Sequence, residues 1–425
     1  MFVAGRRNTM TVAGQPAVAY TYDNANRLLQ MTQGSANVTF SYDAGGRRLS
    51  LTLPNGVTTN YAYDSASELT GITYQSSTNT LGDLSYTYDT AGRRSSIGGS
   101  FARTGLPQAV SSASYNANNQ LTQWGGSPIG YDANGNMTSD STKTYGWDAR
   151  NHLASIGGGV TASFQYDPFR RRVTKSVGGS ATSYLYDGAN AVQELSGSAP
   201  TANLLNAALD EVLTRSVATG TSSYLADALG NTVALADNVG AIQSQYNYEP
   251  FGQTTVSGAV NTNPVQYTGR ENDATGLYYY RARYYNATIQ RFISEDPLTL
   301  GGGDTNLYVY AGSGPTDFTD PFGLQRYDAA PQPKTQKVTA GCMGARLLEN
   351  FFGSTGYPTV TVALNVAAVA VLKPAIAALV PGPGWLYTTT AVGYDLYMVG
   401  KSYTDCKYGV PEPNPPGEIE QLPER

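Results

Sequence analysis

The sequence is poor in charged residues, in cysteine and in histidine. Only 14% of its 425 residues are charged, and 27 basic against 32 acidic side chains leave a net charge of -5. Ordinary soluble domains carry roughly 25% charged residues, and a domain that binds nucleic acid usually shows a basic patch or a high isoelectric point. The charge balance therefore excludes a strongly basic nucleic-acid-binding protein, and we expect no nucleic-acid partner.

Two cysteines and one histidine leave little material for a metal site or a catalytic relay. Cys342 and Cys406 are too few for a disulfide framework and too far from any histidine for a zinc site. They form one bridge or none. With His152 alone, the C-terminal part cannot assemble a Ser-His-Asp relay, an HNH nuclease site or a zinc site. We therefore expect no metal and no cofactor.

An export leader and a long apolar run are also missing from the sequence. Residues 1–7 lack the basic region and apolar run of a secretory signal, so an export signal would lie elsewhere. Residues 359–380 are dense in valine and alanine, but Asn365 and the pair Lys373-Pro374 interrupt them. The remaining run is shorter than the roughly 20 residues of a membrane span. Membrane contact by this region is therefore the less favoured alternative.

Tyrosine and glycine are abundant instead, with 32 and 47 residues. Long exposed helices depend on Ala, Glu, Lys, Leu and Arg. Tyrosine, threonine and valine fit pleated sheets, while glycine and asparagine fit the turns between strands. The composition predicts a mostly β protein.

A Tyr-Asp pair recurs along the N-terminal half of the chain, and four of the seven intervals between neighbouring pairs are 19 to 21 residues long. Each pair is followed by a turn residue and then by an apolar residue, which predicts a strand, a turn and a second strand. The eight pairs, one of them with tryptophan, begin at Tyr22, Tyr42, Tyr63, Tyr88, Tyr131, Trp147, Tyr166 and Tyr186. Around the second pair, alternation predicts a buried face made of Val38, Phe40, Tyr42, Leu49, Leu51 and Leu53.

The aspartate of each pair is predicted to be a turn residue rather than a catalytic one. It can accept hydrogen bonds from backbone amides two or three residues on, while Asn26 and Gly46 adopt positive φ. We interpret His152 as a repeat residue in a position that arginine fills in other repeats. The basic cluster is interpreted as a solvated turn: Arg170, Arg171 and Arg172.

These residues resemble the YD repeats of the RHS family, which includes polymorphic bacterial toxins, insecticidal toxin-complex components and the teneurin shells. The resemblance covers roughly residues 20–324. Its most specific parts resemble the RHS-associated core and its terminus: residues 269–285, residues 291–297, residues 306–310 and Asp320-Pro321-Phe322-Gly323-Leu324. Residues 224–231 depart from it, because they lack the histidine that many relatives carry. Family shells usually wind far more repeats, which leaves closure of this shell open.

The resemblance implies an all-β fold, a spiral of antiparallel β-hairpins with a small, partly helical C-terminal domain. We expect a YD-repeat shell segment over residues 1–245 and an RHS repeat-associated core over residues 246–324. A variable domain should follow over residues 325–409, and a Pro-rich disordered tail over residues 410–425.

The resemblance also implies that the core cuts its own chain between Leu324 and Gln325, with paired aspartates in the manner of an aspartic protease. Asp296 and Asp320 each precede a proline and bracket a glycine-rich segment that could fold one toward the other. Two carboxylates buried close together cannot both ionise, so one could activate water and the other could protonate the leaving amide.

Two arginines complete the predicted site. Arg283 and Arg291 could position the carboxylates or stabilise the oxyanion. The simpler alternative is that Asp-Pro pairs only end strands and set turns.

The function expected on this basis is a secreted or cell-surface shell that holds its own C-terminal domain as cargo and releases it by self-cleavage. An immunity protein is a further partner of such a toxin-like chain. The rival hypothesis is a non-catalytic adhesion module whose tyrosine-rich faces bind a protein or a carbohydrate. A minor alternative makes the C-terminal part a membrane-active toxin.

Overall fold

The computed structural model describes residues 2–3, 6–77, 79–102 and 105–328. The chain divides into two units, Met1–Lys334 and Thr335–Arg425, and the described residues all belong to the first. The predictions for Cys342, Cys406, the apolar region 359–380 and the Pro-rich tail 410–425 lie outside the described residues. So does the variable domain, apart from its first four residues. The predicted domain boundaries stay predictions.

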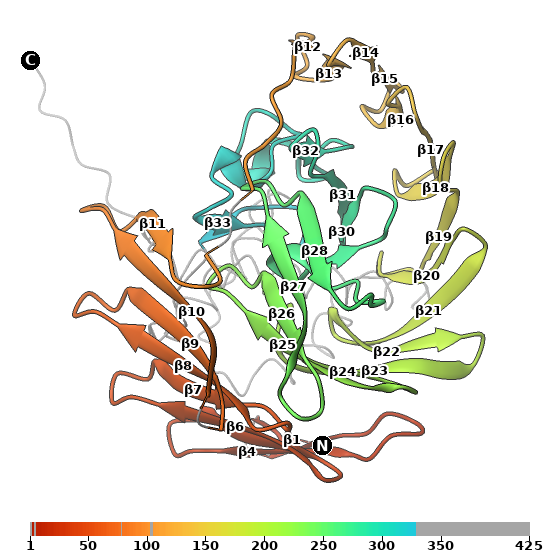
Figure 1. Cartoon of the computed structure of the whole chain (residues 1–425). Coiled ribbons are helices and arrows are strands. Elements are labelled where there is room, and N and C mark those ends of the chain that lie inside the picture. Colours follow the sequence, from red (N-terminus) through yellow and green to blue (C-terminus); the bar gives the residue numbers. More distant parts are fainter. Residues whose placement is uncertain (1, 4–5, 78, 103–104, 329–425) are drawn as a thin grey trace, which may run out of the picture. The chain divides into compact units, whose positions relative to one another are not determined.

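The first sheet is built from the N-terminal repeats, and its strands pair in chain order with antiparallel neighbours (Figure 1). Among the described residues it contains nine strands: β3 (Thr9–Met10), β4 (Val18–Tyr22), β5 (Leu28–Gln33), β6 (Ala36–Tyr42), β7 (Arg48–Thr52), β8 (Val57–Tyr63), β9 (Leu69–Ser76), β10 (Asn79–Tyr88) and β11 (Arg94–Gly98).

The second and larger sheet, here called the wall sheet, follows the same rule of pairing in chain order. In the described part of the chain it contains fourteen strands: β15 (Gly130–Tyr131), β16 (Met137–Ser139), β17 (Thr144–Trp147), β18 (Leu153–Gly157), β19 (Ala162–Tyr166), β20 (Arg172–Val177), β21 (Ser180–Asp187), β22 (Asn190–Ser196), β23 (Ala199–Ala208), β24 (Glu211–Val217), β25 (Gly220–Ala226), β26 (Thr232–Ala236), β27 (Ile242–Tyr248) and β28 (Thr254–Gly258).

Short elements make up the rest of the described chain. The small sheets contain β1 (Phe2–Val3), β2 (Arg6–Arg7), β12 (Ala113–Tyr115), β13 (Leu121–Trp124), β14 (Ser127–Pro128), β29 (Glu271–Asn272), β30 (Tyr278–Tyr280), β31 (Arg283–Asn286), β32 (Arg291–Phe292), β33 (Phe318–Thr319) and β34 (Tyr327–Asp328). The 3-10 helices are η1 (Tyr267–Gly269), η2 (Thr299–Gly302) and η3 (Ala311–Ser313). Within the described ranges, none of the helices has the length and apolar character that crossing a membrane requires. The prediction of an all-β fold of antiparallel hairpins is confirmed.

The repeat turn has the predicted chemistry. Asp23 Oδ1 accepts the amides of Ala25 and Arg27, each at 2.9 Å. Asn26 and Gly46 adopt φ of 65° and 85°. The second amide lies four residues after the aspartate rather than three, because the turn closes with the aspartate amide bonding the Arg27 carbonyl. The aspartate is therefore fully used in shaping the turn.

The position four residues after the turn aspartate bonds its second carboxylate oxygen. Arg47 Nε lies 2.6 Å from Asp43 Oδ2, and His152 Nδ1 lies 3.0 Å from Asp148 Oδ2. The interpretation of His152 as a repeat residue is confirmed, since it makes the contact that arginine makes elsewhere.

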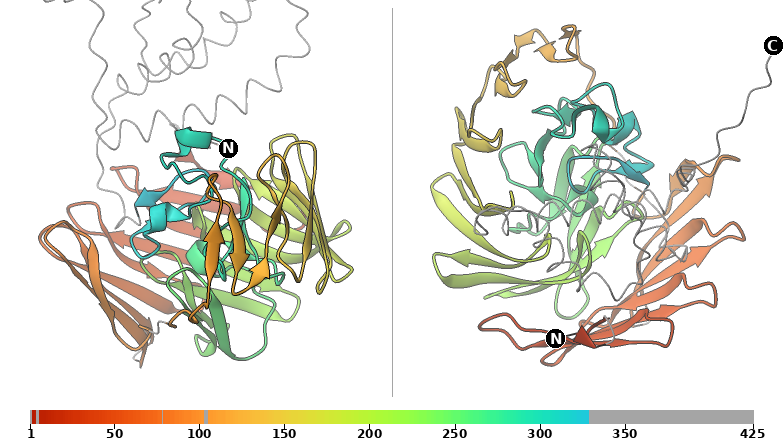
Figure 2. Two further views of the ribbon diagram at one scale, coloured as in Figure 1. Left: turned by 90° about the horizontal axis from the view of Figure 1, so that it is seen from above. Right: turned by 180° about the vertical axis from the view of Figure 1, so that it is seen from behind.

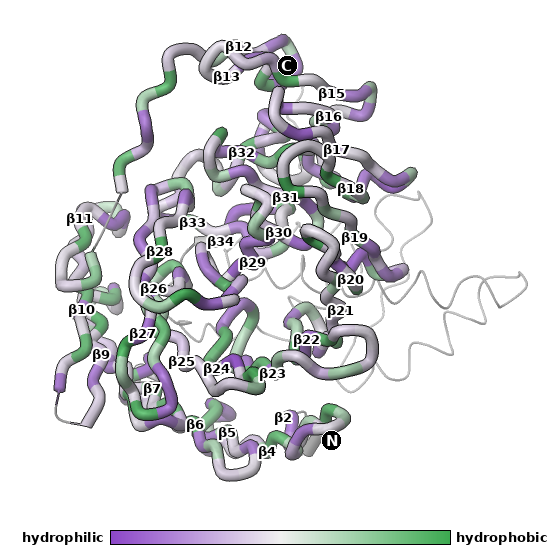
Figure 3. Tube along the Cα trace, turned by 45° about the vertical axis from the view of Figure 1, so that its right-hand side comes forward, coloured by the Kyte–Doolittle hydropathy of each residue, from purple (hydrophilic) through white to green (hydrophobic). Residues whose placement is uncertain are grey.

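The predicted alternation holds for four of the six residues, while Tyr42 is only half-buried and Leu49 is exposed. Val38, Phe40, Leu51 and Leu53 are buried, and Figure 3 shows hydrophobic and hydrophilic residues interspersed along the chain. Leu49, however, is 41% exposed. The register shifts by one residue after Ser41, so Leu49 falls on the outer face while Arg48 is buried against Glu211 of the wall sheet.

The hydrophobic core lies between the sheets and around the C-terminal elements. Strands of the first sheet share buried clusters with Leu205 and Leu213, and with Leu225 and Val233, of the wall sheet. The core segment, residues 265–324, lies inside the curve of the wall sheet (Figures 1 and 2). Its tyrosines are buried. Five of them share one aromatic cluster with tyrosines of the wall sheet: Tyr267, Tyr278, Tyr280, Tyr285 and Tyr310.

Candidate active site

Three of the four residues predicted for catalysis meet in the core segment. Arg283 begins β31, Asp296 follows β32 and Asp320 follows β33. Arg283 Nη2 lies 2.9 Å from Asp296 Oδ2 and 3.3 Å from Asp320 Oδ2. All three side chains are buried, so one guanidinium is shared by two carboxyl groups out of water.

The guanidinium group of Arg283 makes three further contacts that fix its position. Arg283 Nε donates to the carbonyl of Gly323 at 2.5 Å, and Nη1 donates to the carbonyl of Leu307 at 2.9 Å. Its planar group also lies 3.7 Å from the ring centre of Phe292. Because the donors of an arginine form a rigid fork, these contacts fix where the two carboxyl groups lie.

Asp320 reaches the backbone on both sides of the bond predicted to be cut. Its Oδ1 accepts the amide of Leu324 at 2.9 Å and the amide of Gln325 at 3.1 Å. The Gln325 nitrogen would become the new amino terminus after cleavage. One carboxyl group is therefore within hydrogen-bonding distance of the nitrogen that must accept a proton.

Asp296 and the carbonyl of Leu324 face a common point above Gly302. A Cβ added to Gly302 would lie 2.6 Å from Asp296 Oδ2 and 3.0 Å from the Leu324 carbonyl oxygen. The other oxygen of Asp296 accepts the amide of Leu298 at 2.8 Å. A cavity of about 300 Å³ opens here, lined by both aspartates, Arg283 and Gln325. The absence of a side chain at Gly302 leaves open the space that Asp296 Oδ2 and the Leu324 carbonyl oxygen both border.

Burial favours the neutral form of both carboxyl groups. It raises the pKa of Asp320 to about 6, against the opposing effect of Arg283 and of the two backbone amides. Burial also raises the pKa of Asp296, again against Arg283. One cation cannot balance two buried anions, so the arrangement retains a proton up to about pH 6.

Arg291, the fourth predicted residue, is not brought to the two carboxyl groups. Its Nη1 donates to the carbonyl of Asn119 at 2.8 Å, and its guanidinium lies near the rings of Tyr115 and Tyr308. Neighbouring residues on a strand point to opposite faces. Since Phe292 packs against Arg283, Arg291 necessarily points away from the pair.

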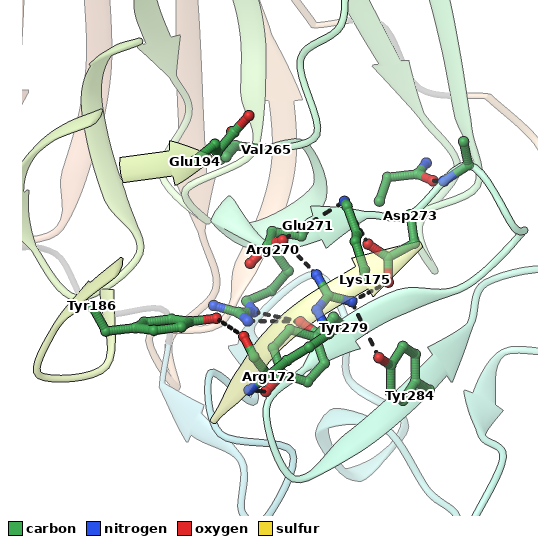
Figure 4. Close-up of polar contacts among 12 residues, drawn as sticks. Arg172, Lys175, Tyr186, Glu194, Val265, Arg270, Glu271, Asp273, Tyr279 and Tyr284 are labelled. Atoms are coloured by element: carbon green, nitrogen blue, oxygen red, sulfur yellow. Dashed lines mark hydrogen bonds and ion pairs between the residues drawn. The ribbon is translucent and has the colours of Figure 1, made fainter. Parts of the chain in front are cut away.

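The interpretation of the basic cluster as a solvated turn is wrong for Arg172. Its side chain is 0% exposed and bonds Asp273 and Glu271 of the core segment (Figure 4), the latter at 2.6 Å. Lys175 Nζ lies 2.9 Å from the other oxygen of Asp273. The guanidinium also covers the ring of Tyr279 at 4.1 Å. Arg172 therefore joins the wall sheet to the core segment.

The contribution of Gly302 could not be found from sequence. The run Gly301-Gly302-Gly303 is visible, but nothing local distinguishes the middle glycine from its neighbours.

Among the described residues, no group of three or more His, Cys, Asp or Glu side chains could hold a metal ion.

Comparison with known proteins places this geometry in context. The family model described as Teneurin YD-shell matches residues 4–97 and 59–311. The tRNA nuclease WapA of Bacillus subtilis strain 168 is 30% identical over 377 residues, which cover 72% of this chain and 15% of that protein. Toxin subunit YenC2 of Yersinia entomophaga is 40% identical over 97 residues, 22% of this chain and 10% of that protein.

Among solved structures, the crystal structure of TcdB2-TccC3 without its hypervariable C-terminal region matches with a TM-score of 0.57 at 20% identity. The match covers 75% of this chain and 21% of that one. At this identity the likeness concerns the fold. The chain spans only a small part of the length of each of these relatives.

Proposed function

The chain belongs to the teneurin YD-shell family, and from that premise we propose that it encloses its own C-terminal part and releases it by cutting between Leu324 and Gln325. The observation that carries the proposal is the position of Asp320, whose Oδ1 lies 3.1 Å from the Gln325 nitrogen. Asp296 and the Leu324 carbonyl face the same point from the other side.

The reaction would be hydrolysis of one peptide bond. Ionised Asp296 takes a proton from a water molecule in the cavity while the water oxygen attacks the Leu324 carbonyl carbon. In the folded chain the Gln325 amide donates to Asp320 Oδ1, and its nitrogen gains a free lone pair only when the Leu324 carbonyl carbon becomes tetrahedral. Protonated Asp320 then donates its proton to that nitrogen as the carbon–nitrogen bond breaks. The products are a carboxyl group on Leu324 and an amino group on Gln325. Arg283 keeps both carboxyl groups in place and favours ionisation of one of them.

The backbone around this bond is held in a closed loop. β33 and β34 pair antiparallel on either side of it, with Phe318 opposite Asp328 and Thr319 opposite Tyr327. Gln325 Nε2 also donates to the carbonyl of Gly301 at 3.1 Å. A bond presented in a fixed loop next to both carboxyl groups needs little further ordering before reaction.

We further propose that residues after Leu324 carry a toxin-like activity and that the protein acts outside the producing cell. The support is the toxin and nuclease names of the relatives. The adhesion hypothesis receives less support, because many tyrosines of the core segment are buried in the aromatic cluster and are not available on a surface.

Intact-mass analysis of the full chain tests the proposal. The wild-type chain should yield a fragment with residues 325–425, roughly a quarter of the 45.1 kDa chain, which Asp320→Asn and Asp296→Asn should abolish. Asp317→Asn is the matched control, because this nearby aspartate bonds the amide of Arg94 instead. A single uncut species in the wild type, or cutting in all variants, would refute the proposal.

A further inference from the structure

Three consecutive carbonyl groups in the turn of residues 320–325, here called the cleavage turn, accept hydrogen bonds from residues 281–283. Arg281 Nη1 donates to the carbonyl of Pro321. The amide of Ala282 donates to Phe322 at 3.1 Å, and Arg283 Nε donates to Gly323 at 2.5 Å. The short segment 281–283 thereby holds the backbone that leads to the bond proposed to be cut.

Arg281 is the member of this segment that also contacts the wall sheet. Its Nη2 and Nη1 lie 2.6 and 3.0 Å from the two oxygens of Asp210, in the turn between β23 and β24. Its Nε and Nη2 donate to the carbonyl of Ala189, in the turn between β21 and β22, at 3.3 and 3.1 Å. The guanidinium also lies 5.1 Å from the ring centre of Phe322. One side chain therefore joins two wall turns to the cleavage turn.

Asp210 is built to hold this arginine. Its side chain is only 10% exposed and also accepts Arg270 Nη1 at 2.5 Å. Its amide is fixed by Asn190 Oδ1 at 3.2 Å. Two arginines of the core segment thus meet one wall carboxylate, in a position that exists only when β21 to β24 have paired.

We propose that Arg281, held by Asp210 of the wall sheet, is a positioning residue for the self-cleavage, so that the chain is cut only once the wall has formed around the core segment. Arg281 does not touch the reacting atoms. It acts through the Pro321 carbonyl and the Phe322 ring, which set the path of the backbone from Asp320 to Gln325. This inference rests on the proposed function, and it adds a condition under which that function operates.

Replacing Arg281 by lysine distinguishes two roles of this side chain: positioning the cleavage turn, and only attaching the core segment to the wall sheet by charge. Lysine keeps a positive charge for Asp210, but it lacks the planar fork needed to bond Asp210, Ala189 and Pro321 together. The expected result for Arg281→Lys is therefore a folded chain that cuts at least about tenfold more slowly, since a lost charge-assisted hydrogen bond is worth about that factor in rate. Thermal melting should change no more than in the control.

Cell-free synthesis with a radioactive pulse gives the rate constant, because it follows the new chain from full length to cut. The matched control is Arg215→Lys, since Arg215 makes a comparably buried bidentate pair with Glu194 that lies within the wall sheet. The control should cut within about twofold of wild type. If Arg281→Lys cuts as fast as the control, attachment by charge is sufficient and the inference is overturned.

Hydrogen exchange provides a readout that does not require cutting. In an Asp296→Asn background, which keeps the chain intact, Arg281→Lys should speed exchange of the Leu324 and Gln325 amides at least about tenfold. Both amides bond Asp320 Oδ1. Exchange in β25 and β26 should stay unchanged. Asp210→Asn should act in the same direction, which keeps the test informative if the lysine variant folds poorly.

The outcomes are separable. Absence of cutting in the wild type would refute the proposed function, while faster exchange in Arg281→Lys would still show that the wall holds the cleavage turn. Cutting in the wild type together with unchanged exchange and unchanged rate in Arg281→Lys would overturn this inference and leave the proposed function standing. Faster exchange without slower cutting would also overturn it.

Discussion

At the scale of single residues, the candidate site contains two buried carboxyl groups and one buried guanidinium group, so its charges do not balance when both carboxyl groups are ionised. Asp296 and Asp320 share Arg283, and burial in low-dielectric surroundings opposes two adjacent negative charges. The state of lower free energy therefore has one proton bound to Asp296 or Asp320. A bound proton next to a peptide nitrogen is what an acid-assisted hydrolysis requires.

Cutting should therefore depend on pH with a known sign. The pKa of Asp320 is raised to about 6, so its acid form is lost as the pH rises through that value. We expect the rate constant to fall above about pH 6, by up to about tenfold per pH unit. Time courses of cell-free chains shifted between pH 5 and 8 measure this. A rate that rises steadily across this range would contradict the role of Asp320 as the acid.

The same shift has a consequence for stability. Because the folded-state pKa of Asp320 is raised, its contribution to stability is fully present below the unfolded-state pKa near 4 and is lost as the pH rises through about 6. Asp320→Asn should remove this pH dependence. Denaturant midpoints at pH 4 and pH 7 would report it when both chains carry Asp296→Asn, which keeps them intact.

Gly302 should be required for cutting although it carries no functional group. A methyl group there would lie 2.6 Å from Asp296 Oδ2 and 3.0 Å from the Leu324 carbonyl, so Gly302→Ala must displace one of them. We expect cutting to slow at least about tenfold with little change in melting temperature. Gly301→Ala is the control, because its added methyl group would make only an ordinary contact, 3.7 Å from Leu298. Equal rates in the two variants would contradict the steric argument.

At the scale of elements, each repeat turn also stabilises the next one. Arg27 Nη1 donates to the carbonyl of Asp43 at 3.1 Å, and its guanidinium lies 4.9 Å from the ring centre of Tyr42. Arg47 makes the same two contacts with Asp64 and Tyr63. Stability along the sheet is therefore a property of neighbouring repeats, as in other repeat proteins.

Tyrosines at strand ends contribute through their hydroxyl groups as well as their rings. Tyr248 OH donates to the carbonyl of Thr232 at 2.7 Å in a buried position. Tyr248→Phe should cost about 1 to 2 kcal/mol, because it leaves that carbonyl without its partner. Tyr115→Phe, at a side chain that is 54% exposed, should cost less than about 0.5 kcal/mol. Urea denaturation followed by circular dichroism compares the two, and equal costs would contradict the prediction.

At the scale of the whole described unit, charged side chains attach the core segment to the wall sheet in both directions. The wall supplies the cation at Arg172 and the anion at Asp210, while the core segment supplies the partners. Such pairs add specificity of docking more than net stability, because each charge loses its hydration on burial.

Removing one partner should nevertheless be costly. Burial opposes ionisation of Asp273, but Arg172 and Lys175 outweigh it and hold the pKa of Asp273 below its usual value. Arg172→Met should cost about 3 kcal/mol at pH 7 by leaving a buried carboxylate with too little positive charge. The cost should shrink as the pH falls below about 4, where Asp273 can take a proton.

The double variant Arg172→Met with Asp273→Asn provides the control. It should recover part of the loss at pH 7, since no buried anion is then left unbalanced. Denaturant unfolding at the two pH values measures all three chains. A loss in Arg172→Met that is independent of pH would contradict the electrostatic explanation.

The sequence by itself determined the features that depend on short stretches of chain. The spacing of the Tyr-Asp pairs is read directly from the sequence. The hydrogen bonds of the turn aspartates and the position of His152 follow from contacts within four residues. The motif at residues 320–324 also predicted the turn at which we propose that the chain is cut. These contacts form whenever the local segment folds, so the pattern is legible in the sequence.

Only the tertiary structure decided which side chains of distant segments meet. It turned Arg291 away from the carboxyl pair, buried Arg172 and brought Arg281 to Asp210, 71 residues earlier in the chain. It also exposed Leu49 by a one-residue shift in register. Such contacts depend on how the hairpins wind around the core segment, and the free energy of that winding is spread over many strands. No single short pattern contains it.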